Sequence, residues 1–488
     1  MNIEKMVEDE VRRPPGQKHY KSQVLAALAV SLGPFAAGLG KGYTSPAMDS
    51  LQGNGTLGSL APQGAGLTIT DQEASWVASL SLLGALFGGM LGGAAMRQGR
   101  RKALLFISLP LSMCWLLTMC ADSVKMLLAT SLVAGFLCAI VSMVSQVYIS
   151  EIAGPDVRGC LSSLLKILNQ TGMLISFTAG AYLDWQQLAL VVACAPIVLF
   201  LSIIYLPETP SFLLLRGKDE EAAKSLQWLR GPEADVRQEL ATIRTNILAS
   251  KRISDTRQYF SKSLFSSRLT GPVLITCGLM LFQRFSGAHA FSFYAVSVFR
   301  KTFGGISPHT GAIAMSGVQI LASCLSGLLI DTVGRLPLLI SSGVLMSLAL
   351  ASFGSYIYYE EVYRHTMALA SLQGEYDWVP LTCVLVFTVA FSLGISPISW
   401  LLIGELFPLE FRSLGSALAT TFSYLCAFVS VKTFVDFQEA LGLYGTFWLY
   451  AGVSICGLCF VVVFVPETKG KEMDEMDPKY IESICINR

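Results

Sequence analysis

Long runs of apolar residues, separated by short polar segments, make up most of this chain. A segment of about 20 mostly apolar residues can cross the hydrocarbon core of a membrane as a helix. Twelve such runs predict twelve membrane-spanning helices, at residues 24–44, 74–95, 103–121, 126–148, 160–182, 188–206, 271–298, 309–330, 337–358, 380–403, 414–434 and 445–465. The predicted fold class is an all-α polytopic membrane protein.

The polar junctions between these runs repeat in the two halves of the chain. Glu151 is followed seven residues later by Arg158, and Glu405 is followed at the same spacing by Arg412. A Gly-Arg sequence precedes each pair and a Pro-Glu-Thr sequence follows it, at Gly99-Arg100 and Gly334-Arg335, and at Pro207-Glu208-Thr209 and Pro466-Glu467-Thr468. A half-chain repeat of membrane spans predicts two similar six-helix bundles with a substrate site between them.

The chain therefore divides into five predicted parts. They are a cytoplasmic N-terminal tail (1–23), an N-terminal six-helix bundle (24–206), a short cytoplasmic helical linker (207–270), a C-terminal six-helix bundle (271–465) and a cytoplasmic C-terminal tail (466–488). In the linker, an amphipathic helix is expected from Asp219 to Gly231, and a second helix from about residue 234 to 248.

The distribution of Lys and Arg predicts the orientation. Residues 45–75 contain neither, whereas the next loop carries Arg97, Arg100, Arg101 and Lys102. Because cytoplasmic loops are rich in Lys and Arg, both termini are expected in the cytoplasm. The plasma membrane is the expected location of the protein. Asn54 begins an Asn-Gly-Thr sequence in the first outer loop and is a predicted glycosylation site.

Composition agrees with a membrane protein and excludes several other classes. Only 14% of the 488 residues are charged and 53% are hydrophobic, whereas soluble proteins carry roughly a quarter charged residues. The net charge of +1 gives no case for nucleic-acid binding, and the twelve cysteines lie almost wholly in apolar runs, so no disulfide framework is expected. No nucleophile elbow, phosphate-binding loop or metal-ligand spacing indicates an enzyme, a cofactor or a metal site.

A series of short motifs then resembles a known family over nearly the whole chain. The motifs are Gly42-Tyr-Thr-Ser-Pro46, Tyr148-Ile-Ser-Glu151, Arg158-Gly159, Pro207-Glu-Thr-Pro210, Gln283 with Ser286-Gly287, Pro397-Ile-Ser-Trp400, Lys432-Thr-Phe434, Gly445-Thr-Phe-Trp448 and Pro466-Glu-Thr-Lys-Gly470. In this order they resemble the sugar-porter branch of the major facilitator superfamily, and within it the insect facilitated trehalose transporters. The resemblance implies the twelve-helix major facilitator fold and alternating access.

The resemblance also implies a set of gating residues. Tyr294 resembles the outer-gate aromatic residue, and charged residues at the cytoplasmic rim are expected to pair across the bundles while the inner gate is shut: Arg100, Arg101, Glu151, Arg158, Glu208, Asp331, Arg335, Glu405, Arg412 and Glu467. The alternative is that these are independent surface charges. Met96, Ser131 and Ser211 stand where relatives carry charged residues, so the N-terminal network is expected to be the weaker one.

By position, the resemblance implies the substrate-binding residues. They are Lys166, Asn169, Gln170, Gln283, Arg284, His289, Gln319, Trp400, Ser423 and Tyr424. Amide and hydroxyl side chains suit a neutral sugar because they match the donors and acceptors of a polyol.

Three of these residues depart from the family pattern, because Lys166, Arg284 and His289 bring potential cations to a neutral-sugar site. A charge deep in a membrane is costly and indicates a functional role. Arg284 either binds an acidic substrate or anion, or packs against carbonyl groups or water in the cavity. His289 can supply proton linkage, since its ordinary pKa lies near neutrality.

The leading prediction is a facilitative transporter for trehalose or a hexose that works as a monomer. Facilitative transport is expected since no Asp or Glu lies within the predicted spans to carry a proton. One alternative is a porter of altered specificity, for an acidic sugar or another anion and with possible proton coupling. Another is a sugar sensor that binds its ligand without transporting it.

Overall fold

The computed structural model describes residues 20–53, 67–154, 157–231, 236–255, 267–303, 305–366, 378–407 and 412–467. Almost all of these residues are helical and none of them lies in a strand. Asn54, most of the two terminal tails, and the side chains of Asp331 and Arg412 lie outside what is described.

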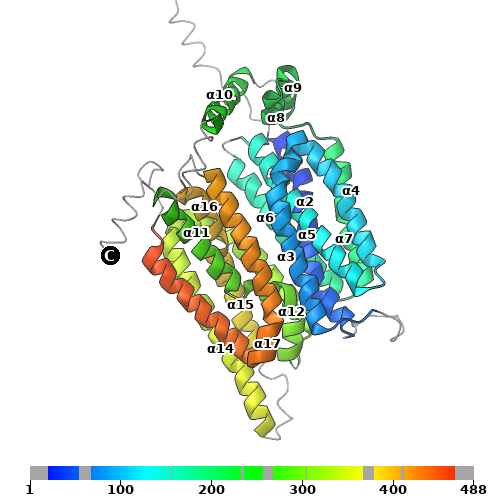
Figure 1. Cartoon of the computed structure of the whole chain (residues 1–488), viewed down its shortest axis with the longest axis vertical. Coiled ribbons are helices and arrows are strands. Elements are labelled where there is room, and N and C mark those ends of the chain that lie inside the picture. The colour runs from blue at the N-terminus through cyan, green and yellow to red at the C-terminus, as the bar shows by residue number, and fades with distance from the viewer. Residues whose placement is uncertain are drawn as a thin grey trace, which may run out of the picture.

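The first bundle contains six helices that correspond one for one to the first six predicted spans. They are α2 (Lys21–Leu51), α3 (Asp71–Ala95), α4 (Arg100–Met119), α5 (Val124–Ile152), α6 (Arg158–Gly180) and α7 (Trp185–Ile204), with a short 3₁₀ turn, η1 (Met96–Gln98), after α3. Figure 1 shows these blue and cyan helices packed together beside the green-to-red second bundle.

The second bundle also makes six crossings, but two of them are broken. Its helices are α11 (Ser267–Phe285), α12 (Ala288–Thr302), α13 (Pro308–Val333), α14 (Arg335–Thr366), α15 (Trp378–Leu393), α16 (Ile395–Leu406) and α17 (Arg412–Phe464). The prediction of continuous helices over 271–298 and 380–403 is wrong, because the first is interrupted at Gly287 and the second at Gly394. A sharp kink at Gly442 divides α17 into the last two crossings (Figure 1).

Nine helical segments of the described chain are individually long and apolar enough to cross a membrane. The remaining crossings have clear reasons for falling outside this group. Lys166, Asn169 and Gln170 make α6 more polar, α11 and α12 share one crossing, and α17 contains two. The total is the twelve crossings that the apolar runs predicted.

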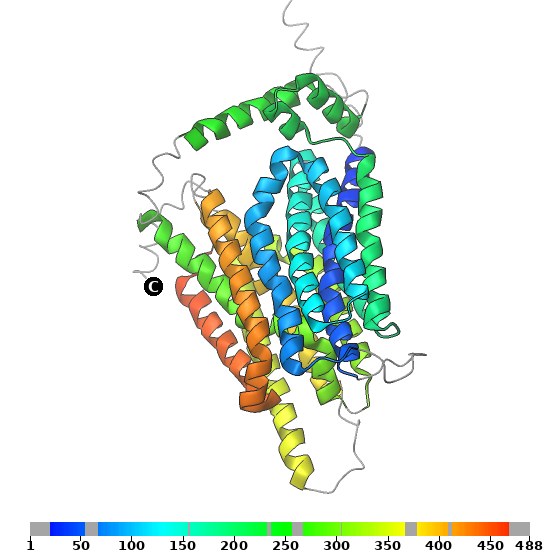
Figure 2. The same ribbon diagram turned by 45° about the vertical axis from the view of Figure 1, so that its right-hand side comes forward.

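Three linker helices, α8 (Pro210–Leu215), α9 (Asp219–Arg230) and α10 (Arg237–Asp255), lie across one end of the molecule (Figure 2), here called the linker end. Two of the linker's contacts attach it to the first bundle. Arg230 donates from Nη1 to the Ile152 carbonyl at 3.0 Å, and Arg216 donates to the Arg97 carbonyl at 2.7 Å. The opposite end of the molecule is called the far end below.

Glycines allow the helices of the first bundle to approach closely. A Cβ atom at Gly84 of α3 would lie 2.0 Å from the Leu132 carbonyl oxygen of α5, and one at Gly88 would lie 2.4 Å from that of Phe136. Gly84 and Gly88 are therefore helix-packing positions. A Cβ atom at Gly93, farther along the same helix, would have no described heavy atom within 4 Å.

The space around Gly84 and Gly93 differs, so alanine should affect stability differently at the two positions. Gly84→Ala is expected to destabilise the protein by about 1–3 kcal/mol, because α3 and α5 must move apart to admit a methyl group. Gly93→Ala is the matched control and is expected to be neutral or stabilising by up to about 1 kcal/mol, since alanine favours the helix. Thermal unfolding in detergent measures both, and equal melting temperatures for the two variants would contradict the packing role.

Candidate functional site

A cavity of about 450 Å³ lies between the two bundles. Helices α2 to α6 of the first bundle and α11, α12, α13, α15, α16 and α17 of the second contribute to its walls. Nine of the ten residues predicted to bind substrate line it: Lys166, Asn169, Gln170, Gln283, Arg284, His289, Gln319, Trp400 and Tyr424. The tenth, Ser423, is fully buried behind this surface and accepts a hydrogen bond from Arg284.

The break between α11 and α12 places three of these residues at one level of the cavity. Gly287 has a φ of +86°, a left-handed conformation that favours glycine. Gln283 and Arg284 therefore end one helix, and His289 begins the next. Ser286 donates to the Gln283 carbonyl at 2.8 Å, and Ser430 donates to the Arg284 carbonyl at 2.9 Å. These hydroxyls give partners to carbonyl groups that the broken helix leaves free.

The polar groups that contact Arg284 directly are neutral. Its Nε donates to the Ser423 hydroxyl at 2.8 Å, its Nη1 contacts His289 Nε2, and its guanidinium lies 5.7 Å from the ring centroid of Trp400. Because an arginine can only donate, His289 Nε2 must accept in this contact, which requires a neutral imidazole with its proton on Nδ1. Among the described residues, Arg284 has no carboxylate partner.

The break between α15 and α16 shapes the adjoining part of the wall. The Ser342 hydroxyl of α14 donates to the Ala390 carbonyl at 2.7 Å and accepts the Ile395 N–H at 3.3 Å. Gln283 then donates to the Ile395 and Ser396 carbonyls, both at 3.1 Å. The Gln283 side chain therefore fixes the start of α16, the helix that carries Trp400 into the cavity.

The predicted binding residue Asn169 has a structural contact of its own, and one charged residue of the described cavity lining was missed. The Asn169 amide donates to the Pro34 carbonyl of α2 at 2.8 Å, so it also joins two helices. Lys41 of α2 lines the cavity but was not among the candidates. Its signal was present in the sequence, because a lysine between Gly40 and Gly42 interrupts an apolar run.

At the linker end, the repeated charged motifs form the same network in each bundle. Arg100 pairs with Glu151 at 2.6 Å, and Glu208 accepts the backbone N–H groups of Arg100 and Arg101 at 2.9 and 3.0 Å. In the second half, Arg335 pairs with Glu405 at 3.1 Å, and Glu467 accepts the N–H groups of Arg335 and Leu336 at 3.2 and 2.9 Å. Each Pro-Glu-Thr carboxylate thus caps the positive end of a helix.

The side chains of the other described linker-end residues also contact their own bundle. Arg158 donates to the Ala153 carbonyl at 3.5 Å, and Arg101 donates to the Ile203 and Ile204 carbonyls at 3.3 and 2.7 Å. In this conformation Glu151 thus pairs with Arg100 of its own bundle, and Arg158 contacts a backbone carbonyl.

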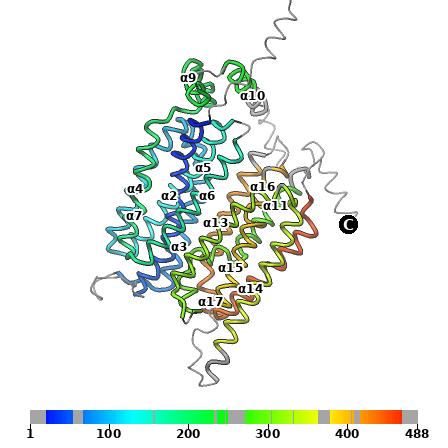
Figure 3. Tube along the Cα trace, turned by 180° about the vertical axis from the view of Figure 1, so that it is seen from behind, coloured from blue at the N-terminus to red at the C-terminus, as the bar shows by residue number. Residues whose placement is uncertain are grey.

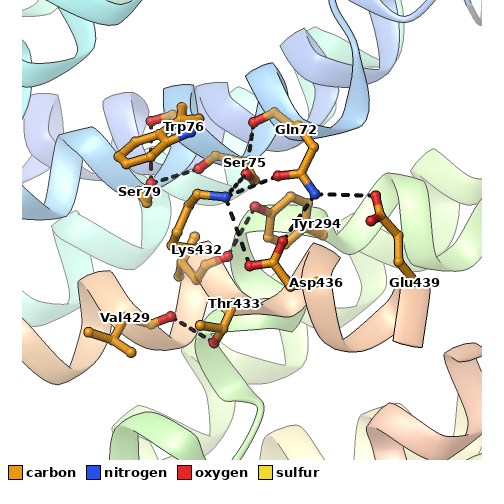
Figure 4. Close-up of polar contacts among 11 residues, drawn as sticks. Gln72, Ser75, Trp76, Ser79, Tyr294, Val429, Lys432, Thr433, Asp436 and Glu439 are labelled. Atoms are coloured by element: carbon orange, nitrogen blue, oxygen red, sulfur yellow. Dashed lines mark hydrogen bonds and ion pairs between the residues drawn. The ribbon is translucent and has the colours of Figure 1, made fainter. Parts of the chain in front are cut away.

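At the far end, polar contacts join the two bundles directly (Figure 4). Gln72 of α3 donates to Asp436 at 3.0 Å and to Glu439 at 3.2 Å, both on α17. Lys432 of α17 donates to Gln72 and Ser75 at 3.1 and 3.0 Å, and its ammonium lies 5.0 Å from the ring centroid of Trp76. We call these six residues the far-end contact.

A second far-end group joins α2 to α12 and α13. Arg300 forms an ion pair with the buried Asp49, which His309 also approaches, at 3.7 Å. The Val296 N–H donates to Ser45 at 3.0 Å. Among the described residues, the hydrogen bonds and ion pairs that cross between the bundles all belong to these two far-end groups.

Tyr294, the predicted gate aromatic residue, lies beside these contacts and is itself buried. Its ring stacks on Phe434 with the centroids 4.8 Å apart, and its hydroxyl donates to the Val431 carbonyl at 3.2 Å. Its backbone departs from helical geometry, so α12 bends at this residue.

The two bundles also pack against each other through helices. In the view from behind, α13 runs beside α6 of the other bundle (Figure 3).

Comparison with known proteins gives consistent matches over the whole chain. Residues 17–480 match the family described as "Sugar (and other) transporter". The chain is 36% identical to the facilitated trehalose transporter Tret1 of Apis mellifera ligustica, over 96% of this chain and 90% of the relative. It is 37% identical to Tret1 of Bombyx mori, over 94% of this chain and 86% of the relative.

The fold has solved counterparts as well. A partially occluded inward-open structure of the xylose transporter XylE from E. coli matches with a TM-score of 0.71 and 22% identity, over 92% of this chain and 99% of the other. A structure of the same proton:xylose symporter bound to 6-bromo-6-deoxy-D-glucose matches with a TM-score of 0.70 and 21% identity, over 95% and 98%. These similarities establish the major facilitator fold.

The support of the α15–α16 break by Ser342 can be tested. Ser342→Ala is expected to destabilise the protein by about 1–3 kcal/mol, because it leaves the buried Ile395 N–H without its partner. Ser341→Ala is the matched control, since that hydroxyl is exposed and donates only to the Leu338 carbonyl of its own helix. Thermal melting in detergent should fall for Ser342→Ala alone; an equal fall for both variants would refute this support.

Proposed function

The chain belongs to the sugar transporter family of the major facilitator superfamily, and from that premise we propose that it is a facilitative transporter of trehalose or a hexose. The observation that carries this proposal is the cavity between the bundles, lined by residues of both. Its volume of about 450 Å³ falls within the usual range for small-molecule sites, roughly 300–1,000 Å³. The trehalose transporters among its relatives support the substrate class.

The chemistry of the cavity wall supports a sugar as the substrate. Gln170 and Gln319 project amide groups from opposite bundles, and Trp400 and Tyr424 supply aromatic rings. Amide groups can both donate to and accept from sugar hydroxyls. In our proposal, all ten residues predicted from the family resemblance contribute to substrate binding, with Ser423 acting through Arg284 and Gln283 also positioning α16.

The distribution of contacts between the bundles supports alternating access. The far-end contact and the Asp49–Arg300 group join the bundles at one end, whereas the described contacts of the charged linker-end motifs stay within each bundle. We propose that the far end faces outward and that this conformation is inward-facing. The linker and both termini are then cytoplasmic, in the plasma membrane, and the protein works as a monomer.

The proposed transport cycle gives the two ends opposite roles. Opening the far end requires its cross-bundle contacts, together with the Tyr294 region, to separate. The charged linker-end residues would then approach one another across the bundles: Arg100, Arg101, Glu151, Arg158, Glu208, Asp331, Arg335, Glu405, Arg412 and Glu467. Exposed ion pairs contribute about 0–1 kcal/mol each, so a network is needed to balance two conformations.

Transport without proton coupling is the form of the mechanism that the site favours. None of the described residues lining the cavity is an Asp or Glu that could carry a proton. The contact of Arg284 with His289 Nε2 requires a neutral imidazole, so protonation of His289 at this atom would break it. We therefore propose uniport as the form of transport.

The proposed function predicts uptake of labelled trehalose or glucose into vesicles containing the purified protein, down the sugar gradient and unchanged by an imposed proton gradient. Gln319→Ala is expected to raise the KM about 5- to 10-fold, the loss of roughly 1 kcal/mol from one hydrogen bond. Gln187→Ala, at an exposed position outside the cavity, is the matched control and should leave the KM unchanged. The proposal fails if the vesicles transport no sugar or if a proton gradient drives accumulation.

The gating proposal predicts that Lys432→Met favours the outward-facing conformation, because it removes the hydrogen bonds to Gln72 and Ser75. A cysteine at Ser297, beside the far-end interface, should react several-fold faster with a membrane-impermeant maleimide in this variant. The background needs Cys120→Ser, since Cys120 is exposed near the same end. Lys224→Met on α9 is the control, and equal labelling rates would argue against the far-end contact as a gate.

A further inference from the structure

Positive side chains gather in the cavity without negative ones. Lys41, Lys166 and Arg284 line it, and His289 lies against Arg284. No described lining residue is acidic. Neutral amides and hydroxyls suffice for a neutral sugar, so these cations need another explanation.

Arg284 and Lys41 form the centre of this positive region, although they come from opposite bundles. Both side chains line the same cavity, where their like charges repel each other. Lys41 makes no hydrogen bond or ion pair with the described residues, and its side chain is exposed where the cavity opens beside it. The described polar partners of Arg284 are the neutral Ser423 hydroxyl and His289 ring. The fold therefore holds two like charges together without a described counter-ion.

Neither charge can reach bulk water by extending toward a membrane surface. Lys41 lies twenty residues after the start of α2, about 30 Å along a helix that rises 1.5 Å per residue. In the other direction, the far end is closed by Asp49, Arg300 and the far-end contact. Arg284 is fixed at the α11–α12 break by Ser423. Both charges therefore lie within the cavity, and charges at such depth indicate a functional role.

We propose that Arg284 and Lys41 form an anion subsite within the sugar cavity. The ligand group is either a carboxylate on the transported sugar or a small inorganic anion that binds beside a neutral sugar. Because the two cations belong to different bundles, an anion between them also draws the bundles together around the substrate. The inference rests on the proposed function, since it takes the cavity to be the sugar site.

The two sources of negative charge make different predictions for binding. Calorimetry on the full-length protein in detergent would measure the affinities for glucose and for glucuronate. The glucose measurement is made once with chloride present and once with chloride replaced by dextran sulfate, a polymer too large for the cavity. If the sugar carries the anion, glucuronate should bind at least about tenfold more tightly than glucose. If the anion is inorganic, glucose should bind tightly only with chloride present.

Variants link either result to the two cations. Lys41→Met and Arg284→Gln are each expected to weaken glucuronate binding about tenfold or more, or to abolish the chloride requirement of glucose binding. Arg284→Lys retains the charge and should keep part of the anion affinity. Lys224→Met on α9 removes a lysine remote from the cavity and should behave as wild type. Melting curves identify any variant that fails to fold.

The subsite is overturned if the folded wild type and variants bind glucose equally with and without chloride and prefer glucose to glucuronate. Flux measured separately in vesicles distinguishes this failure from failure of the proposed function. Anion-dependent binding without flux of either sugar would refute transport and leave the subsite standing. Flux of neutral sugar with no anion dependence would refute the subsite and leave transport standing.

Discussion

Inside a membrane, a backbone N–H or C=O group that leaves its helix must find another partner, and the site depends on how this protein meets that requirement. The breaks at Gly287 and Gly394 free such groups in the second bundle. Hydroxyls supply partners at both breaks, from Ser286, Ser430 and Ser342. Without them, the breaks that present Arg284, His289 and Trp400 to the cavity would leave buried groups unpaired.

Electrostatics differs between the two ends of the molecule and its middle. Carboxylates and cations are balanced at the linker end, as in Arg100–Glu151, and at the far end, as in Asp49–Arg300. In the cavity, Lys41 and Arg284 contribute positive charge from the two bundles without a described acidic partner. At the two ends the described charges are balanced by ion pairs within the protein. In the cavity, the balancing negative charge would come from a bound ligand.

The sequence predicted the spans well, because a membrane demands apolar runs of a set length and such runs are visible without pairing information. It did not predict the break at Gly287, since Ser-Gly within an apolar run is also typical of helix packing. The partners of Lys432 were hidden because Gln72 lies 360 residues away, and no local pattern joins them. Most predicted binding residues do line one cavity, but Lys41 was overlooked among the glycines of α2.

The unequal placement of the helix breaks has a mechanical consequence. In the first bundle α2 to α7 run as single helices, whereas in the second bundle two of the crossings are jointed halfway, at Gly287 and Gly394. A force applied across the substrate can be absorbed by bending within α11–α12 or α15–α16. Bending between the two ends of the molecule can thus occur in the second half at Gly287 and Gly394, as well as at Tyr294.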